Sequence, residues 1–149
     1  MIRHASSQDI PRLSQIARDA YAPYVPLIGA EPPPMLQDFA ADIWDNAVWV
    51  SGDPPLGYVV ARPKGADWLL ENVAVAPEAQ GTGLGRALIQ FAERAGARRG
   101  FTRIVLYTNV HMSANLSMYP ALGYTEVDRR EEDGMDRVFF EKRLAPRRG

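Results

Sequence analysis

Apolar residues recur at intervals of three and four along three stretches of the chain, which is the spacing that one face of a helix requires. The first stretch follows Ser6 and Asp9, whose side chains suit a helix start, and ends at Tyr21. The second covers residues 35–46 and the third covers residues 83–100. In the third stretch charged side chains occupy the opposite face, so we predict an amphipathic helix that packs on a core.

Shorter apolar runs between turn residues predict strands. Turns rich in Gly, Pro and Asp separate the second, third and fourth runs, so antiparallel neighbours are expected there. Asp133-Gly134 predicts a hairpin turn between the last two runs, and a short helix is expected over residues 113–118. The predicted strands cover residues 2–5, 47–51, 56–62, 68–76, 103–108, 124–130 and 138–144. Elements in this order predict an α/β (α+β) mixed sheet with helices on its faces.

Residues 22–34 carry five prolines and a glycine, a composition that argues against a regular helix. The same segment contains Tyr24, Val25, Leu27 and Ile28, and is therefore too apolar for a floppy linker. We predict an ordered apolar loop.

Length and composition predict one globular domain over residues 1–145, with residues 146–149 as a frayed tail. A net charge of -1 gives no reason to expect nucleic acid or a membrane as partner. Cysteine is absent, which excludes a disulfide scaffold, a Cys-ligated metal and a Cys nucleophile. The N-terminus lacks the apolar run of a signal peptide, and no stretch approaches the roughly 18 apolar residues of a membrane span. We expect a cytoplasmic protein.

The most informative segment is the glycine-rich loop over residues 80–86, which follows a buried strand and opens a helix. Gly81, Gly83 and Gly85 lack a β-carbon, so the backbone there can approach a ligand closely. The first N–H groups of a helix have no intrahelical acceptor and carry partial positive charge, which suits a phosphate or pyrophosphate. Arg86 adds a cation at the same place. A glycine turn without a ligand is the alternative.

Two common phosphate-binding patterns do not fit this loop. A P-loop requires Gly-Lys-Ser/Thr, whereas Gly85 is followed by Arg86 and Ala87, so no hydroxyl is placed to hold Mg²⁺. In a dinucleotide fingerprint counted from Gly81 or Gly83, the last glycine position holds Arg86 or Leu88.

The loop Gln80-Gly81-Thr82-Gly83-Leu84-Gly85 resembles the Gln/Arg-x-x-Gly-x-Gly/Ala signature of the GNAT acetyltransferases. The resemblance covers nearly the whole chain, because the order of elements is also similar. It implies a GNAT-type acyl-CoA N-acyltransferase fold: a central, mostly antiparallel sheet with one parallel pair, flanked by helices. It also implies that acetyl-CoA is the acetyl donor, with its pyrophosphate on the loop and its pantetheine arm along the preceding strand. The positions carried over are Val73, Ala74, Val75, Gln80, Gly81, Thr82, Gly83, Leu84, Gly85 and Arg86.

A second segment, residues 107–124, resembles the family's closing motif Asn-x-x-Ala-x-x-Leu-Tyr-x-x-x-Gly-Phe, with Tyr119, Gly123 and Tyr124 in place. Two positions depart from it, since Met112 stands at the usual Asn and Asn115 at the usual Ala. Pro120 is expected to end the helix early. The resemblance implies that Asn115 contacts the coenzyme arm, with Asn109 as a rival for that role.

Transfer from a thioester to an amine requires a neutral amine and a leaving thiolate. Glu71 lies just before the coenzyme-binding strand and is the candidate base, although a free Glu has a pKa of about 4.3 and would need burial or a relaying water. A surface or salt-bridged carboxylate is the alternative reading of Glu71. Tyr119 is the candidate donor to the departing sulfur, and packing is its alternative. Proton transfer from a phenol of pKa about 10 to a thiolate of about 8.5 is uphill by roughly 2 kcal/mol, so a hydrogen bond is its expected contribution.

His4 and His111 are the only histidines, and neither has carboxylates at ligand spacing, so no metal site is expected. His111 is an alternative base or a loop residue near the mouth of the site. The resemblance places the acceptor pocket at the Pro-rich loop and its flanks. The candidate substrate-binding residues are Tyr21, Tyr24, Met35, Asn72 and Thr108, with Glu31, Asp38 or Asp42 to attract a cation.

The sequence therefore predicts an N-acetyltransferase that moves the acetyl group of acetyl-CoA directly to a small-molecule amine. A protein or peptide N-acetyltransferase is one alternative, and a non-catalytic acyl-CoA-binding sensor is the other. The resemblance to this family also implies that a homodimer is possible.

Overall fold

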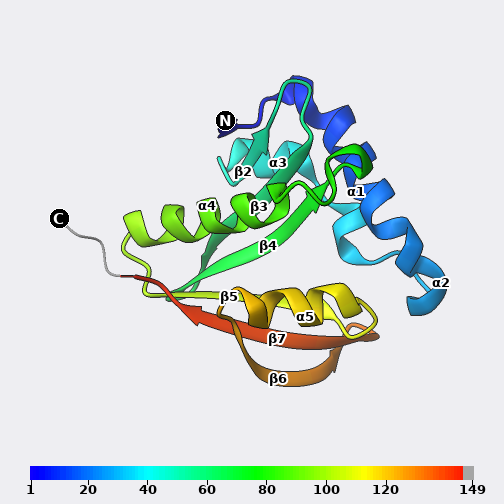
Figure 1. Cartoon of the computed structure of the whole chain (residues 1–149), viewed down its shortest axis with the longest axis vertical. Helices are drawn as coiled ribbons and strands as arrows, with labels where there is room; N and C mark the ends of the chain where they lie inside the picture. Colours follow the sequence, from blue (N-terminus) through cyan, green and yellow to red (C-terminus); the bar gives the residue numbers. More distant parts are fainter. Residues whose placement is uncertain (146–149) are drawn as a thin grey trace. The chain divides into compact units, whose positions relative to one another are not determined.

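Figure 1 shows the computed structural model of the chain, which describes residues 1–145. Seven strands form one sheet in the order β1-β2-β3-β4-β5-β7-β6. Their bounds are β1 Ile2–His4, β2 Val48–Ser51, β3 Gly57–Lys64, β4 Asp67–Val75, β5 Arg103–Asn109, β6 Thr125–Glu132 and β7 Met135–Arg143. The predicted tail, residues 146–149, lies outside the described residues. The chain divides into two compact units, residues 1–62 with 70–92, and residues 63–69 with the part from Glu93 onward. The single domain over residues 1–145 stays a prediction.

The sheet has one parallel pair. β4 and β5 run parallel, with Trp68 opposite Ile104 and Leu69 opposite Val105. β1 with β2, β2 with β3, β5 with β7 and β6 with β7 are antiparallel. This arrangement confirms the expected mixed sheet.

In the first unit, α1 (Ile10–Tyr21) begins where predicted. Asp9 precedes it, accepts a hydrogen bond from Ser6 N at 2.8 Å, and forms an ion pair with Arg3 at 2.9 Å. The hydrophobic spacing buries Leu13 and Ile16 completely. The first turns of α4 (Leu84–Arg98) belong to the same unit, and Leu84 and Leu88 approach the β3 backbone at Gly57. Packing of that strand against the helix start holds the glycine-rich loop in place.

The prediction of no helix over residues 22–34 is wrong. A 3₁₀ turn covers Ala22–Tyr24, α2 covers Val25–Ile28, and a second 3₁₀ turn covers Pro33–Leu36. Each begins with proline in its first turn, where the missing N–H breaks no helical hydrogen bond. The next helix, α3 (Phe39–Trp44), begins later than predicted because Asp38 caps it by accepting from Ala41 N at 3.1 Å.

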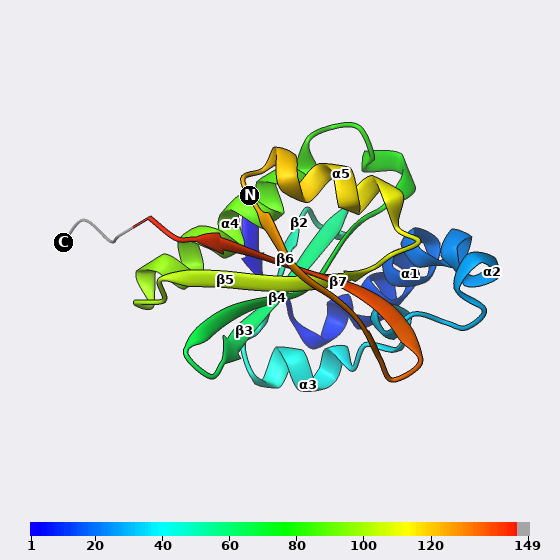
Figure 2. The ribbon, with the colours of Figure 1, turned by 90° about the horizontal axis from the view of Figure 1, so that it is seen from below.

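In the second unit, β7 lies between β5 and β6, and α5 (Ser113–Ala121) runs along this group (Figure 1). Figure 2 shows the same strands from below, with β6 at the edge beside β7. The hairpin turn is as predicted, with φ of 52° at Asp133 and 77° at Gly134, although both strands extend further toward it than expected. Pro120 does not end α5 early, since the helix continues to Ala121. Proline lacks the N–H that would donate to the carbonyl four residues earlier, so the helix loses that hydrogen bond but still continues for one residue beyond Pro120.

None of the helices within the described residues is long and apolar enough to cross a membrane.

Candidate active site

The glycine-rich loop joins β4 to α4. A 3₁₀ turn over Pro77–Ala79 is followed by Gln80, and the chain then enters the first turn of the helix. Gly81 and Gly83 have φ of 79° and 85°, and apart from the adjoining residues of the chain no described atom lies within 4 Å of the position that a β-carbon would occupy. Both positions favour glycine because of their backbone conformation, and the space beside them is open.

The backbone N–H groups of this loop are available to a ligand. Within residues 1–145, those of residues 81–85 donate to no acceptor. The Thr82 hydroxyl donates to the Ala79 carbonyl at 2.5 Å and so braces the loop from inside. Arg86 is exposed in the first turn of a helix of 15 residues. Free N–H groups, a helix N-terminus and a cation together suit a phosphate or pyrophosphate.

β4 presents two different faces beside this loop. Glu71, Val73 and Val75 are half-buried and alternate with the buried Asn72 and Ala74. Successive side chains of a strand point to opposite faces, so the first three share one face. The Val75 side chain lies 3.5 Å from the position of a β-carbon on Gly85. The end of β4 and the first turn of α4 are therefore adjacent, as the motif predicts.

Glu71 is held by two partners. Its Oε1 atom lies 3.1 Å from Arg62 Nε, and its Oε2 atom accepts from Gln37 Nε2 at 2.6 Å. The side chain remains 25% exposed. The salt-bridged reading of Glu71 is thus observed, and the remaining exposure leaves the carboxylate accessible to a proton donor.

Behind Glu71 lies a buried carboxylate. Asp42 accepts from the same Gln37 amide at 2.8 Å and pairs closely with Arg62. Burial raises the pKa of the Asp42 carboxyl, the charge of Glu71 adds to that shift, and the contacts with Gln37 and Arg62 oppose it. Asp45 pairs with Arg62 at 3.1 Å. The Arg62 guanidinium therefore forms ion pairs with three carboxylates, those of Asp42, Asp45 and Glu71.

Sequence reasoning missed Gln37 and Arg62. Gln37 follows a 3₁₀ turn that was not predicted, and its amide does not belong to a regular pattern. Arg62 carried a signal, because it follows five buried residues of β3 and a charge at such a place requires a partner.

The predicted acceptor-binding residues of the first unit have different surroundings. The Tyr21 hydroxyl lies 3.0 Å from Asn72 Oδ1 and 2.9 Å from the Val73 carbonyl. Tyr24 and Met35 are half-buried in the helical turns of the Pro-rich segment. Glu31 is exposed, and Asp38 is used as the cap of α3.

In the second unit, Asn109 and Asn115 occupy different hydrogen bonds. Asn115 Nδ2 donates to Thr108 Oγ1 at 3.1 Å, while Asn109 Oδ1 accepts from His111 N at 2.9 Å and thereby shapes the loop after β5. Thr108 is buried, with its hydroxyl 3.4 Å from Met112 Sδ. His111 is exposed.

Tyr119 is buried on α5, 5% exposed. Its ring packs on Tyr124 and Phe140, with centroids 5.5 and 5.8 Å away. Its hydroxyl has no hydrogen-bond partner among the described residues. Burial raises the pKa of Tyr119 above that of a free phenol, so the hydroxyl stays protonated near neutral pH.

His4 stacks on Trp49 at 5.2 Å, and the described residues contain no group of three or more His, Cys, Asp or Glu placed to hold a metal ion.

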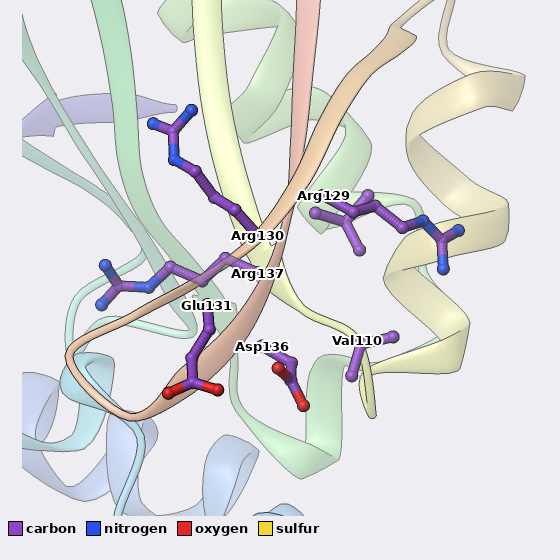
Figure 3. Close-up of a pocket in the computed structure, with 7 residues that line it drawn as sticks. Val110, Arg129, Arg130, Glu131, Asp136 and Arg137 are labelled. Carbon is purple, nitrogen blue, oxygen red and sulfur yellow. The ribbon is translucent and has the colours of Figure 1, made fainter.

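A hollow of 270 Å³ lies at the β6–β7 hairpin, lined by Val110, Arg129, Arg130, Glu131, Asp136, Arg137 and Val138. Figure 3 shows that Arg129 points to one side of the hairpin, and Arg130 and Arg137 point to the other. Arg130 lies 4.0 Å from the Phe139 ring centroid and Arg137 lies 4.5 Å from that of Tyr107. The arginines do not converge, so the hollow does not form an anion site.

The sequence matches the model of the Acetyltransferase (GNAT) family over residues 11–124. Two relatives are named mycothiol acetyltransferase. The one from Amycolatopsis mediterranei (strain U-32) is 46% identical over 61 residues, and the one from Kocuria rhizophila is 39% identical over 82 residues. These segments cover 41% and 54% of this chain but only 19% and 23% of the relatives. The chain therefore matches about a fifth of their length.

Two solved structures have similar folds. The ribosomal-protein-S18-alanine N-acetyltransferase from Escherichia coli is 21% identical with a TM-score of 0.75, and the match covers 100% of this chain and 96% of that one. The PaiA N-acetyltransferase from Thermoplasma acidophilum, in complex with coenzyme A, is 21% identical with a TM-score of 0.78, covering 96% and 98%.

Proposed function

This chain belongs to the GNAT family of acetyltransferases, and on that premise we propose that it moves the acetyl group of acetyl-CoA directly to the amine of a small molecule. The chain has no Cys to carry an acetyl group, and direct attack by the amine needs no covalent intermediate on the protein.

The observation that carries the proposal is the open glycine-rich loop. Its unpaired N–H groups, the positive φ of Gly81 and Gly83, and the empty space beside both glycines suit the pyrophosphate of coenzyme A. Exposed Arg86 adds a charge complementary to the phosphates. The half-buried face of β4 that carries Val73 and Val75 would then receive the pantetheine arm.

Two side chains supply the proton chemistry. Glu71 would accept a proton from the attacking amine, through a water where direct contact is absent. Tyr119 would donate a hydrogen bond to the departing thiolate. Its raised pKa makes complete proton transfer less favourable than for a free phenol, so stabilisation of the thiolate charge is its larger contribution.

The names of relatives and of similar structures bear on the class of the acceptor. The relatives named mycothiol acetyltransferase favour a small molecule, although the match covers about a fifth of their length. The Escherichia coli structure is named for a ribosomal protein, so a protein or peptide acceptor is the second candidate. We favour the small amine because two relatives share the name of an enzyme that acetylates a small molecule.

Thiol release from acetyl-CoA tests the proposal, and a thiol-reactive dye reads it without background because the protein has no Cys. The acceptors are polyamines, amino acids, arylamines, aminoglycosides and short peptides. Turnover with a free amine but with no peptide supports the proposal. Turnover with peptides alone supports the second candidate, and acetyl-CoA binding without turnover indicates a sensor.

A further inference from the structure

The Gln37 amide joins two carboxylates of the first unit. Its Nε2 atom donates to Asp42 Oδ2 at 2.8 Å and to Glu71 Oε2 at 2.6 Å. An amide nitrogen carries two hydrogens, so both are used. Gln37 is half-buried, and Asp42 is only 5% exposed at its side chain.

The orientation of this amide is fixed from its other end. Gln37 Oε1 accepts from Asn72 Nδ2 at 3.4 Å, and Asn72 Oδ1 lies 3.0 Å from the Tyr21 hydroxyl. Turning the amide over would direct its oxygen at two carboxylates, which are acceptors only. These hydrogen bonds are therefore compatible with only one orientation of the Gln37 amide.

The Glu71 carboxylate is therefore held by a hydrogen bond at one oxygen and by an ion pair at the other. Gln37 holds Oε2, and Arg62 Nε lies 3.1 Å from Oε1. Arg62 is itself fixed by Asp42 and by Asp45 at 3.1 Å. Arg62 Nε is close enough to Oε1 for an ion pair but makes no hydrogen bond to it, whereas the Gln37 hydrogen bond uses one of the two lone pairs of Oε2, so each oxygen of Glu71 keeps a lone pair for an incoming proton.

We propose that Gln37 is a positioning residue that holds the Glu71 carboxylate in the orientation needed to accept the proton of the amine. This inference rests on the proposed function, in which Glu71 is the base. Gln37 does not exchange a proton itself. It acts by fixing the direction of the free lone pair, and displacement of a catalytic group by about 1 Å can lower a rate 10²-fold.

Gln37→Met tests the proposal because it keeps the length of the side chain and removes both donors. We expect kcat for the amine to fall between about 10- and 100-fold, with the KM for acetyl-CoA changed less than about twofold. Gln90→Met is the matched control, since Gln90 is exposed on α4 and is expected to leave kcat unchanged. Thermal midpoints of both variants show whether they are folded.

Gln37→Glu gives a second readout that a purely structural role would not produce. The charged groups around position 37 are Asp38 and Asp45 at the two ends of α3, Asp42 within it, Arg62 of β3 and Glu71 of β4. A charged Glu at position 37 repels Asp42 and Glu71, whereas a protonated one can donate to either. The ratio of the kcat of Gln37→Glu to that of wild type is therefore expected to rise as pH falls, while the ratio for Gln37→Met stays flat.

A wild-type kcat in Gln37→Met overturns the inference while leaving the proposed function intact. A ratio for Gln37→Glu that does not change with pH also overturns it, and this variant decides the matter if Gln37→Met does not fold. Absence of turnover by the wild-type protein with every amine overturns the proposed function, and the inference with it.

Discussion

The ring of Tyr119 packs at an angle of 71° against the ring of Tyr124, with the two centroids 5.5 Å apart. The Tyr124 hydroxyl donates to Glu93 at 2.8 Å, and Lys142 pairs with Glu93 at 3.1 Å. Tyr124 is thus held in place from behind, while the Tyr119 hydroxyl meets no hydrogen-bond partner among the described residues. The Tyr124 hydroxyl is therefore already hydrogen-bonded within the protein, whereas the Tyr119 hydroxyl is free to donate to a ligand.

Tyr119→Phe is expected to lower kcat about 10²-fold and to change the binding of acetyl-CoA little, because only the hydrogen bond to the departing thiolate is lost. Steady-state kinetics with acetyl-CoA and a good amine measure both quantities. Tyr124→Phe is the matched control, and it is expected to lower the free energy of unfolding by about 1 kcal/mol with kcat retained. An unchanged kcat in Tyr119→Phe removes Tyr119 from the mechanism.

Glu71→Gln is expected to lower kcat/KM for the amine about 10²-fold at neutral pH, because the amide cannot accept the proton. Glu131→Gln, at an exposed position of β6, serves as the control of equal charge change. The same loss in both variants would point to net charge rather than to a base. If Glu71→Gln and the wild type have equal rates, Glu71 is not the base, and water or His111 accepts the proton instead.

Gly83→Ala tests the glycine-rich loop. An alanine at φ 85° costs about 1–2 kcal/mol of stability, and we expect the affinity for acetyl-CoA to fall because the loop relaxes away from that conformation. Gly134→Ala imposes comparable strain at φ 77°, also with open space around the new β-carbon, in the hairpin turn. Calorimetric titration with coenzyme A should therefore separate the two variants. Equal affinities would mean that this loop does not bind the coenzyme.

The hydrogen bonds and ion pair with Arg3 hold the pKa of the Asp9 carboxyl below its usual range, with the Ser6 N–H adding to the effect. A lowered pKa contributes stability above the unfolded value of about 3.9, and this contribution is lost as pH falls through the folded value. Asp9→Asn is expected to lower the free energy of unfolding by about 1–2 kcal/mol at pH 7 and by less below about pH 4. Urea titrations at several pH values measure this, with exposed Asp19→Asn as control. A loss of equal size at every pH would contradict the assignment.

The spacing of apolar residues predicted most of the helices and strands, because the residues that are buried in the structure follow that spacing. Leu88 and Ile89 of α4 and Ile104 and Leu106 of β5 are buried where the pattern places apolar residues. The prediction for the Pro-rich segment, residues 22–34, was wrong for a local reason. Proline breaks the interior of a helix, whereas in one-turn helices it can occupy the first turn.

The candidate site was predicted only in part. Motif spacing made Glu71 and the glycine-rich loop candidates because the roles proposed for them depend on neighbouring positions along the chain. Gln37 and Arg62 reach Glu71 from segments that are 34 and 9 residues away, and no local pattern reports such a contact. Side-chain hydrogen bonds between distant segments need the three-dimensional structure.

The central claim, direct acetyl transfer to a small amine, is tested most directly by initial rates of thiol release with acetyl-CoA and the amine both varied. We expect release that depends on the amine, double-reciprocal lines that intersect, and an N-acetylated amine in the product mixture. Release that is independent of the amine, or parallel lines that indicate an acetylated protein, would contradict it.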